Sequence, residues 1–132
     1  MKFSCIYPLY YGSKLSEVEL SLKSIVNQSL KANEILIIQD GPIKLEVLKF
    51  LKKFKKKKIR IVAFINNLGL GKVLRKAVRL AKYDIIIRAD ADDFSQKERF
   101  KCLINYFKKN PEIHVVSSYV KEIYNKKILI KK

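Results

Sequence analysis

The stretch Tyr83-Asp84-Ile85-Ile86-Ile87-Arg88-Ala89-Asp90-Ala91-Asp92-Asp93 decides how the rest of the chain is interpreted. A short apolar run, of the kind found in buried strands, ends there in three carboxylates within four residues. Clustered carboxylates repel one another and lose hydration if they are buried without a partner. A divalent cation would remove this conflict, because oxygen ligands at a strand end suit Mg²⁺ or Mn²⁺ and leave positions open for phosphates. The alternative is an Asp-rich turn that caps a helix starting near Ser95.

The length and composition indicate one folded domain. The chain has 132 residues, 48% of them hydrophobic, including 7 Phe and 7 Tyr residues, which argues against disorder. The apolar runs are too short to cross a bilayer, and residues 1–8 are typical of a first strand and not of a signal peptide. Cys5 and Cys102 lack metal-ligand spacing and lie on apolar faces of predicted elements. We therefore expect two buried free thiols in the reducing cytoplasm.

The chain is strongly basic, with 29 Lys and Arg residues against 12 Asp and Glu residues and a formal net charge of +17. Such a surface attracts polyanions, which include phosphorylated substrates, anionic membranes and nucleic acid. The densest run, Lys52–Lys58, is also typical of the solvated end of a helix, where positive charge complements the helix C-terminus. The charge alone identifies no partner.

Short β-type runs alternate with helical patterns along the chain, which is typical of a parallel α/β sheet. Pro8 is expected to stop the first strand, Ser16 and Glu19 to form a capping box, and Asn110-Pro111 to end the last helix. The predicted strands are Lys2–Tyr7, Glu34–Gln39, Ile59–Phe64, Asp84–Ala89 and Ile113–Val120. The predicted helices are Leu15–Gln28, 45–54, Leu70–Ala81 and Gln96–Lys109, and Glu122–Ile130 is expected to form a hairpin.

Polar and glycine-containing segments follow four of these predicted strands. They are Pro8–Tyr11, Asp40-Gly41, Asn66–Lys72 and Asp90–Asp93. In open α/β sheets, ligands bind outside the carboxyl ends of the strands, so these segments should meet at one edge. The third segment opens a helix and offers backbone N–H groups and a Lys to an anion. Together the four segments predict a nucleoside-diphosphate site.

In this order, the same residues resemble the nucleotide-binding part of a family 2 glycosyltransferase with the GT-A fold. Gln39-Asp40-Gly41-Pro42 resembles the Asp-Asp-Gly-Ser element of that family, and Asp90-Ala91-Asp92-Asp93 resembles its Asp-x-Asp metal motif. Asn67–Lys72 is similar to its Asn-x-Gly segment, and Ser24–Ser29 to its opening segment. The resemblance covers nearly the whole chain. It implies one domain over residues 1–132, a Rossmann-like three-layer sandwich with a mostly parallel central sheet.

The resemblance also implies a nucleoside-diphosphate sugar as donor, with a UDP-sugar favoured. Pro8 and Tyr10 would line the base pocket, and Asp40 would hydrogen-bond the nucleobase or the ribose. Asn67 and Lys72 would lie beside the nucleotide and its phosphates. Taken without the family pattern, each of these residues is explained as a turn, loop or helix-entry residue.

For the metal, the resemblance implies Mn²⁺ or Mg²⁺ with Asp92 as the principal ligand. Asp93 would lie beside it or shape the sugar pocket, and Asp90 would approach the ribose or the metal. Arg88 is either a charge partner of this cluster or a phosphate contact. A metal held there would stabilise the charge on the departing diphosphate.

The implied activity is transfer of the sugar to a saccharide or lipid-linked acceptor in bacterial surface-polysaccharide assembly. It would take place in the cytoplasm, with peripheral contact to an anionic membrane and without nucleic acid. An inverting transfer needs a carboxylate base, but Glu98, Glu112 and Glu122, the acids after Asp93, do not match the family's base. We therefore expect a domain truncated after its fifth strand, with its general base unknown.

Two alternative functions follow from the same sequence. The first is a catalytically incomplete nucleotide-sugar-binding remnant or subunit, motivated by the unmatched base. The second is a basic nucleic-acid-binding module, motivated only by the net charge of +17.

Overall fold

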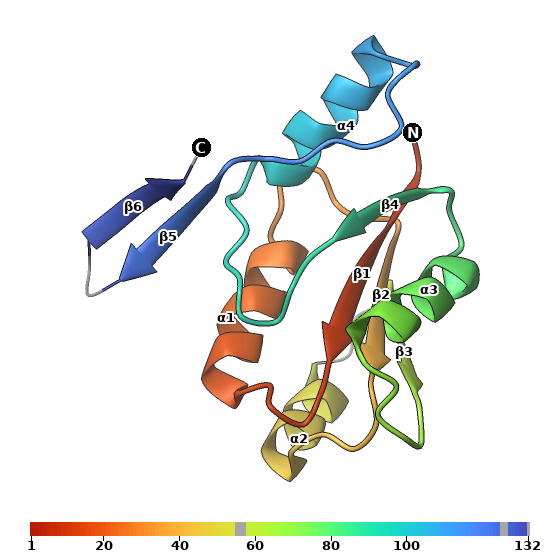
Figure 1. Cartoon of the computed structure of the whole chain (residues 1–132), viewed down its shortest axis with the longest axis vertical. Coiled ribbons are helices and arrows are strands. Elements are labelled where there is room, and N and C mark those ends of the chain that lie inside the picture. The colour runs from red at the N-terminus through yellow and green to blue at the C-terminus, as the bar shows by residue number, and fades with distance from the viewer. Residues whose placement is uncertain (55–57, 125–126, 132) are drawn as a thin grey trace.

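The computed structural model describes residues 1–54, 58–124 and 127–131, and it alternates strands and helices from β1 to α4 before a final hairpin (Figure 1). The strands are β1 Phe3–Leu9, β2 Glu34–Gln39, β3 Ile59–Ala63, β4 Ile85–Arg88, β5 Val120–Tyr124 and β6 Lys127–Lys131. The helices are α1 Leu15–Val26, α2 Leu45–Lys53, α3 Leu70–Leu80 and α4 Arg99–Lys109. None of the helices in the described ranges has the length and hydrophobicity needed to cross a membrane.

The main sheet is parallel throughout, with the strand order β3-β2-β1-β4. This arrangement confirms the predicted α/β class with a parallel central sheet. The central strands are buried, as their apolar runs require: all six residues of β2 are buried, and in β1 only Pro8 is partly exposed. Parallel sheets need cover on both faces, and the helices provide it.

Helices cover both faces of the sheet, which gives three layers (Figure 1). One core cluster joins α1, α2 and α4 to one face, and within it the rings of Phe3 and Phe100 meet edge to face at 5.6 Å. The other cluster joins α3 to the opposite face through Val73 and Ala77, which pack with Ile6 of β1. The carboxyl ends of all four strands therefore lie at one edge, between the helical layers.

Pro8 does not stop β1, because the strand continues to Leu9 and Pro8 pairs in register with Ile38 of β2. Alternate residues of β1 bond to its two neighbours: the Leu9 carbonyl accepts from Asp40 N–H, whereas the Ile6 carbonyl accepts from Ala89 N–H. The missing N–H of Pro8 thus belongs to the β4 side, where strand pairing has already ended.

The predicted fifth strand is wrong. Residues 113–119 have no regular secondary structure, and Val115 and Tyr119 are 85% and 86% exposed. Strand propensity produces a strand only where a neighbour completes the hydrogen bonding, and this segment has no such neighbour among the described residues. The chain instead forms a separate antiparallel pair, β5 with β6, in the region where a hairpin was expected. Its turn, residues 125 and 126, lies outside the described residues.

The helix α1 begins at Leu15 as predicted but without the expected cap, and the start of α4 differs from prediction. Lys14 is the N-cap of α1 and no side chain caps this helix, so the expected capping box of Ser16 and Glu19 is wrong. The helix α4 begins at Arg99 instead of Gln96, because hydrogen bonds from Gln28 and Ser29, which follow α1, hold residues 95–97. The start of α4 thus depends on tertiary contacts, which local patterns do not contain.

Candidate nucleotide and metal site

The carboxyl-edge loops that were predicted to converge do so. Backbone hydrogen bonds hold the strand ends together: Asp40 N–H donates to Leu9 C=O at 2.7 Å, and Phe64 N–H donates to Gln39 C=O at 2.9 Å. The register of β4 on β1 brings the Asp90–Asp93 loop to the same edge. The four predicted segments therefore surround the end of β1 (Figure 1).

Asp40 anchors the loop that leads into α3. Its carboxylate is buried and accepts two backbone hydrogen bonds, from Leu68 N–H at 2.6 Å and from Gly69 N–H at 3.0 Å. The Asn67 side-chain amide also donates to the Asp40 carbonyl, at 3.3 Å. An ionised carboxylate can accept about four hydrogen bonds, so Asp40 retains capacity for a ligand while it holds this loop.

Gly41 lets the loops after β2 and β3 approach closely. Its φ of 78° lies in the left-handed region, and a Cβ at this position would stand 2.7 Å from the backbone nitrogen of Asn67. Any other residue would clash there and strain the backbone. The Asp40-Gly41 pair thus fixes where Asn67 lies.

Tyr10 follows β1 and presents an aromatic ring at the site edge. The residue is 56% exposed, and its ring lies against Gly12, where a Cβ would come within 2.3 Å of a ring carbon. Ser13 closes the turn, because its Oγ accepts from Tyr10 N–H at 3.2 Å. Pro8 precedes this turn and is half-buried. An exposed ring held in this way can stack on a planar base.

Lys72 lies in the first turn of α3 and is exposed. Gly69, the residue before the first residue of α3, is the N-cap, with a φ of 83°, and no side chain caps the helix. The start of α3 therefore combines the positive end of the helix dipole with a Lys ammonium group. Such a combination can bind an anion.

The acidic loop, residues 90–93, has one carboxylate that already pairs with a cation and two that are exposed. Asp90 is half-buried, and its Oδ1 accepts a hydrogen bond from Arg88 Nε at 2.8 Å, so the charge-partner interpretation of Arg88 agrees with the structure. Asp92 and Asp93 are exposed. Partial desolvation, followed by the negative charges of Asp92 and Asp90, raises the pKa of Asp93.

The donor set fits a divalent cation shared with a ligand. Hard carboxylate oxygens suit Mg²⁺ and Mn²⁺, and a cation would relieve the repulsion that raises the pKa of Asp93. Throughout the described part of the chain, no three His, Cys, Asp or Glu side chains form a group that could hold a metal ion. Asp92 and Asp93 alone would leave most coordination positions to water and phosphate, as is usual for Mg²⁺.

A buried polar seam joins α1 to the acidic loop and the start of α4; we call Ser21, Ser24 and Gln28 the α1 seam. Ser21 Oγ donates to Asp90 C=O at 2.7 Å, and Ser24 Oγ accepts from Ser95 N–H at 3.0 Å.

Gln28 makes the largest number of contacts in this seam. Its amide nitrogen donates to the carbonyls of Ser24, Ser95 and Gln96, at 3.2, 3.3 and 2.7 Å. Its amide oxygen accepts from Phe100 N–H at 3.0 Å, and the residue is 0% exposed. From sequence, residues 24–29 stand out only through their family resemblance, which implies no role for them. The signal that could have identified them is the position of Gln28, which continues the apolar spacing of Leu22 and Ile25 at the end of the predicted helix.

Glu98 stands immediately before α4 and is exposed. A hydrogen bond from Ser29, with further contributions from Lys101, holds the pKa of Glu98 below its usual value. A lowered pKa makes a carboxylate a weaker base. The structure therefore gives no reason to assign Glu98 as the general base.

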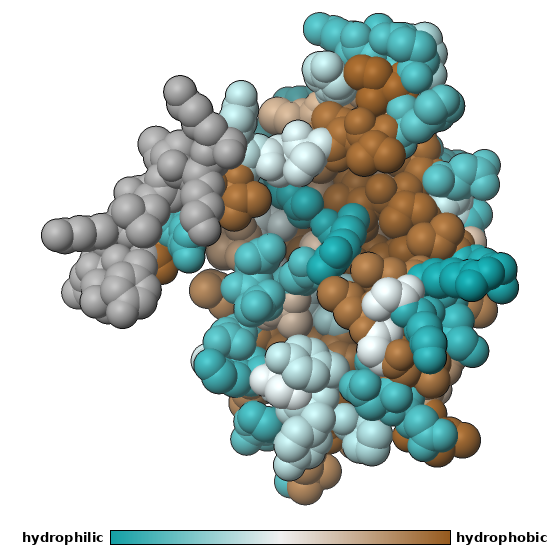
Figure 2. Space-filling view, viewed as in Figure 1, coloured by the Kyte–Doolittle hydropathy of each residue, from teal (hydrophilic) through white to brown (hydrophobic). Residues whose placement is uncertain are grey.

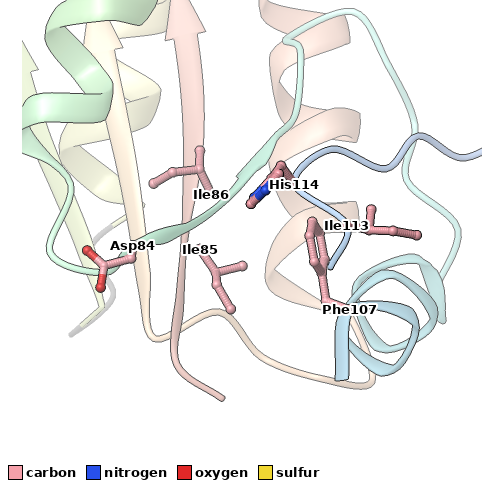
Figure 3. Close-up of a pocket in the computed structure, with 6 residues that line it drawn as sticks. All are labelled: Asp84, Ile85, Ile86, Phe107, Ile113 and His114. Atoms are coloured by element: carbon pink, nitrogen blue, oxygen red, sulfur yellow. The ribbon is translucent and has the colours of Figure 1, made fainter. Parts of the chain in front are cut away.

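One cavity lies at the opposite end of β4 from the acidic loop. It has a volume of about 330 Å³ and is lined by Asp84, Ile85, Ile86, Phe107, Ile113 and His114. Figure 3 shows His114 and Ile113 beside β4, with Phe107 contributed by α4. Because Asp84 begins this end of the strand, the cavity is separate from the site at the carboxyl edge.

The chain matches the family model for glycosyl transferase family 2 over residues 4–131, and it belongs to that family. It is 30% identical over 122 residues to the UDP-Gal:alpha-D-GlcNAc-diphosphoundecaprenol beta-1,3-galactosyltransferase of Escherichia coli. This match covers 92% of this chain and 44% of the E. coli protein. It is 32% identical over 112 residues to the amylovoran biosynthesis glycosyltransferase AmsE of Erwinia amylovora, covering 84% of this chain and 42% of AmsE. The chain therefore spans less than half the length of these relatives.

Solved glycosyltransferase structures confirm the predicted GT-A fold. The structure of S. aureus TarS 1-349 in complex with UDP-GlcNAc superposes with a TM-score of 0.72 and 26% sequence identity. The match covers 84% of this chain and 32% of the TarS chain.

Proposed function

We propose that this protein binds a nucleoside-diphosphate sugar, with a UDP-sugar favoured, and transfers the sugar with inversion to a saccharide or lipid-linked acceptor. The observation that carries this proposal is the meeting of the Asp40-anchored loop and the Asp90–Asp93 loop at one sheet edge. The first loop supplies helix-terminal N–H groups and a cation, and the second supplies carboxylates. A nucleoside diphosphate with its metal requires both.

The nucleotide would lie across the carboxyl ends of β1 and β2. Tyr10 would stack on the base beside Pro8, and Asn67 would contact the nucleotide. Lys72 would pair with the phosphates from the first turn of α3. Asp40 would keep Asn67 and the helix start in position through the two hydrogen bonds it accepts, and it would use its remaining lone pairs on the nucleoside.

Asp92 and Asp93 would hold Mn²⁺ or Mg²⁺, with Asp90 directed by Arg88. When bound, the ion supplies positive charge to the diphosphate as it leaves. The protein's own contribution is to hold these carboxylates in a fixed loop, through Ser21 on the Asp90 carbonyl and the other residues of the α1 seam. Rigid placement of charged groups is worth most where charge develops in the reaction.

Related proteins support the choice of donor and acceptor. The name of the E. coli relative gives UDP-Gal as donor and a sugar diphosphoundecaprenol as acceptor. The relative from E. amylovora acts in amylovoran biosynthesis, and TarS was solved with UDP-GlcNAc. We accordingly propose a role in surface-polysaccharide biosynthesis, in the cytoplasm and peripheral to the membrane.

A thermal-shift panel tests the proposal. The melting temperature would be measured with UDP, GDP, dTDP and ATP, each with and without Mn²⁺. We expect the largest increase with UDP and Mn²⁺ together, because a ligand that binds only the folded state stabilises it. An equal response to all four nucleotides, or no response to any, would contradict a specific donor site.

A further inference from the structure

The positive charge of the chain is concentrated in one continuous segment. Residues 47–83 contain no Asp or Glu and 13 Lys or Arg residues, which are Lys49, Lys52, Lys53, Lys55, Lys56, Lys57, Lys58, Arg60, Lys72, Arg75, Lys76, Arg79 and Lys82. The other 95 residues carry 16 cations and 12 acids, so they are nearly balanced. A general enrichment in Lys would spread the excess positive charge along the whole chain. Here the excess is concentrated in residues 47–83.

Within that segment, α3 presents a basic stripe, which we define as Lys72, Arg75, Lys76 and Arg79. The spacing i, i+3, i+4, i+7 places the four residues on one side of the helix, and all four are exposed. Val73 and Ala77, each 0% exposed, hold the opposite side of α3 against the sheet. The stripe therefore faces solvent along the whole helix. Figure 2 shows hydrophilic side chains gathered over α3.

Four exposed aliphatic side chains lie on α3 or in the loop before it, and we call them the aliphatic border. Val78 and Leu80 of α3 are 53% and 38% exposed. Leu70 at the start of the helix is 49% exposed, and Ile65 in the preceding loop is 89% exposed. The nearby ring of Phe64 is half-buried and lies 5.1 Å from Lys76 Nζ, so it does not offer a free face for stacking.

From this combination, we propose that the basic stripe of α3 and its aliphatic border form a surface that binds anionic lipid bilayers. Cations attract anionic headgroups, and flanking aliphatic side chains can enter the boundary between headgroups and acyl chains. A nucleic-acid surface would instead combine cations with exposed aromatic rings that stack on bases. The exposed large hydrophobic residues between positions 61 and 80 are all aliphatic.

The position of α3 relates this surface to the candidate site. The helix begins at Leu70, directly after the Gly69 N–H that Asp40 holds, so the stripe starts at the carboxyl edge of the sheet. A bilayer on the stripe would thus lie beside the bound donor, where a lipid-linked acceptor could reach it. The choice of a membrane as the partner rests on the proposed function, whereas the charge distribution and the aliphatic border are observed independently of it.

Vesicle sedimentation tests this proposal. The whole chain would be mixed with vesicles of phosphatidylcholine alone, or of phosphatidylcholine with phosphatidylglycerol, at physiological ionic strength. We expect binding only to the anionic vesicles. The variant R75Q/K76Q/R79Q leaves Lys72 in place and removes three cations. Because each well-placed cation raises affinity about fivefold, this variant should bind roughly 100-fold more weakly.

A charge-matched control separates this stripe from net charge. K101Q/K108Q/K109Q removes three exposed cations from α4, and we expect little loss of vesicle binding. Equal losses in both triple variants would overturn the proposal. A third variant, I65S/V78S, keeps every cation, and weaker binding to anionic vesicles by this variant would confirm that the aliphatic border contributes.

Polynucleotide binding and UDP binding are measured on the same samples. Tighter binding to a mixed-sequence oligonucleotide than to anionic vesicles, lost in R75Q/K76Q/R79Q, would assign the surface to nucleic acid and overturn the proposal. The thermal shift with UDP and Mn²⁺ should be unchanged in that variant. If R75Q/K76Q/R79Q loses vesicle binding but keeps the thermal shift with UDP and Mn²⁺, the membrane-binding surface is supported independently of the donor site. Vesicle binding without any UDP response would contradict the donor site and leave this surface established.

Discussion

Asp40 illustrates how one carboxylate can serve the fold and the site together. It is the residue that the family resemblance assigns to the nucleoside, yet both of its oxygens accept backbone N–H groups 28 and 29 residues further along the chain. No local pattern could predict those two bonds, because they depend on how the loops after β2 and β3 meet. By contrast, the exposure of Asp92 and Asp93 follows from their position after a buried strand.

Replacement of Asp40 tests its anchoring role. D40A would leave the N–H groups of Leu68 and Gly69 without their acceptor, and we expect a loss of about 2–4 kcal/mol in the free energy of unfolding. D92A removes an exposed carboxylate and should change stability by less than about 0.5 kcal/mol. Urea denaturation of both variants measures the difference. Equal stability of D40A and the wild-type protein would show that the two bonds do not hold the loop.

The two cysteines differ more than their sequence contexts indicate. Cys5 is buried as predicted, and its burial raises the pKa of its thiol to about 12, but Cys102 is exposed on α4 and the prediction for it is wrong. The apolar face of α4 is carried by Phe100 and Ile104, and Cys102 lies off that face.

Thiol chemistry follows from this difference, because only an accessible thiolate reacts. A disulfide reagent that releases a coloured thiolate should react quickly with Cys102 alone in the native protein and with both Cys5 and Cys102 in denaturant. The C102S variant should show no fast reaction. A fast reaction that persists in C102S would mean that Cys5 is accessible.

At the scale of elements, the strands of the parallel sheet and the helix faces were predictable, because buried apolar runs and helical spacing are local signals. The start of α4 was not, since Gln28 holds residues 95 and 96 in a non-helical conformation. The segment 113–119 has strand-forming residues but finds no pairing partner in the described chain. Propensity alone did not decide its structure.

The α1 seam yields a prediction about the acidic loop. Q28A removes four hydrogen bonds, three of them buried, and should destabilise the protein by about 2–4 kcal/mol. It should also weaken Mn²⁺-dependent UDP binding, because residues that follow Asp93 lose their support. The control I104A removes core packing from α4 and should destabilise the protein by a comparable amount. It should leave UDP affinity unchanged. Equal UDP affinity in Q28A and I104A would reduce Gln28 to a purely structural role.

Glu34 links the starts of β1, β2 and β3 to the residues after α3. Burial alone would raise its pKa, but hydrogen bonds from Lys82 N–H and Ser4 and the charge of Arg60 outweigh this effect and lower it. A lowered folded-state pKa means that the carboxylate stabilises the fold above its ordinary pKa of 4.5. That contribution is lost as the pH falls through the folded-state pKa.

The pH dependence of E34Q tests this linkage. Near neutral pH, the variant should be less stable than wild type by about 1–3 kcal/mol, and this gap should narrow as the pH falls below 4.5. E46Q, at an exposed position on α2, should show no such gap. Urea denaturation across the acid range gives both curves, and a gap that stays constant with pH would refute the assignment.

Across the whole molecule, the fold separates two chemical surfaces. The carboxyl edge of the sheet gathers Tyr10, Asp40, Lys72 and the acidic loop, while the basic stripe of α3 starts at this edge and extends away from it along the helix. The order of motifs predicted the first surface, since parallel topology brings successive strand ends together. The second required the structure, because only the helix packing shows which cations share a solvent-facing stripe.

The most direct test of the central claim is calorimetric titration of UDP into the protein with and without Mn²⁺. D92A is the test variant, and D84A, an exposed carboxylate at the other end of β4, is the matched control. The account predicts that wild type and D84A bind UDP in a Mn²⁺-dependent manner and that D92A does not. Binding that is equal in all three proteins, or absent from a folded wild-type protein, would contradict a metal-assisted donor site at this edge.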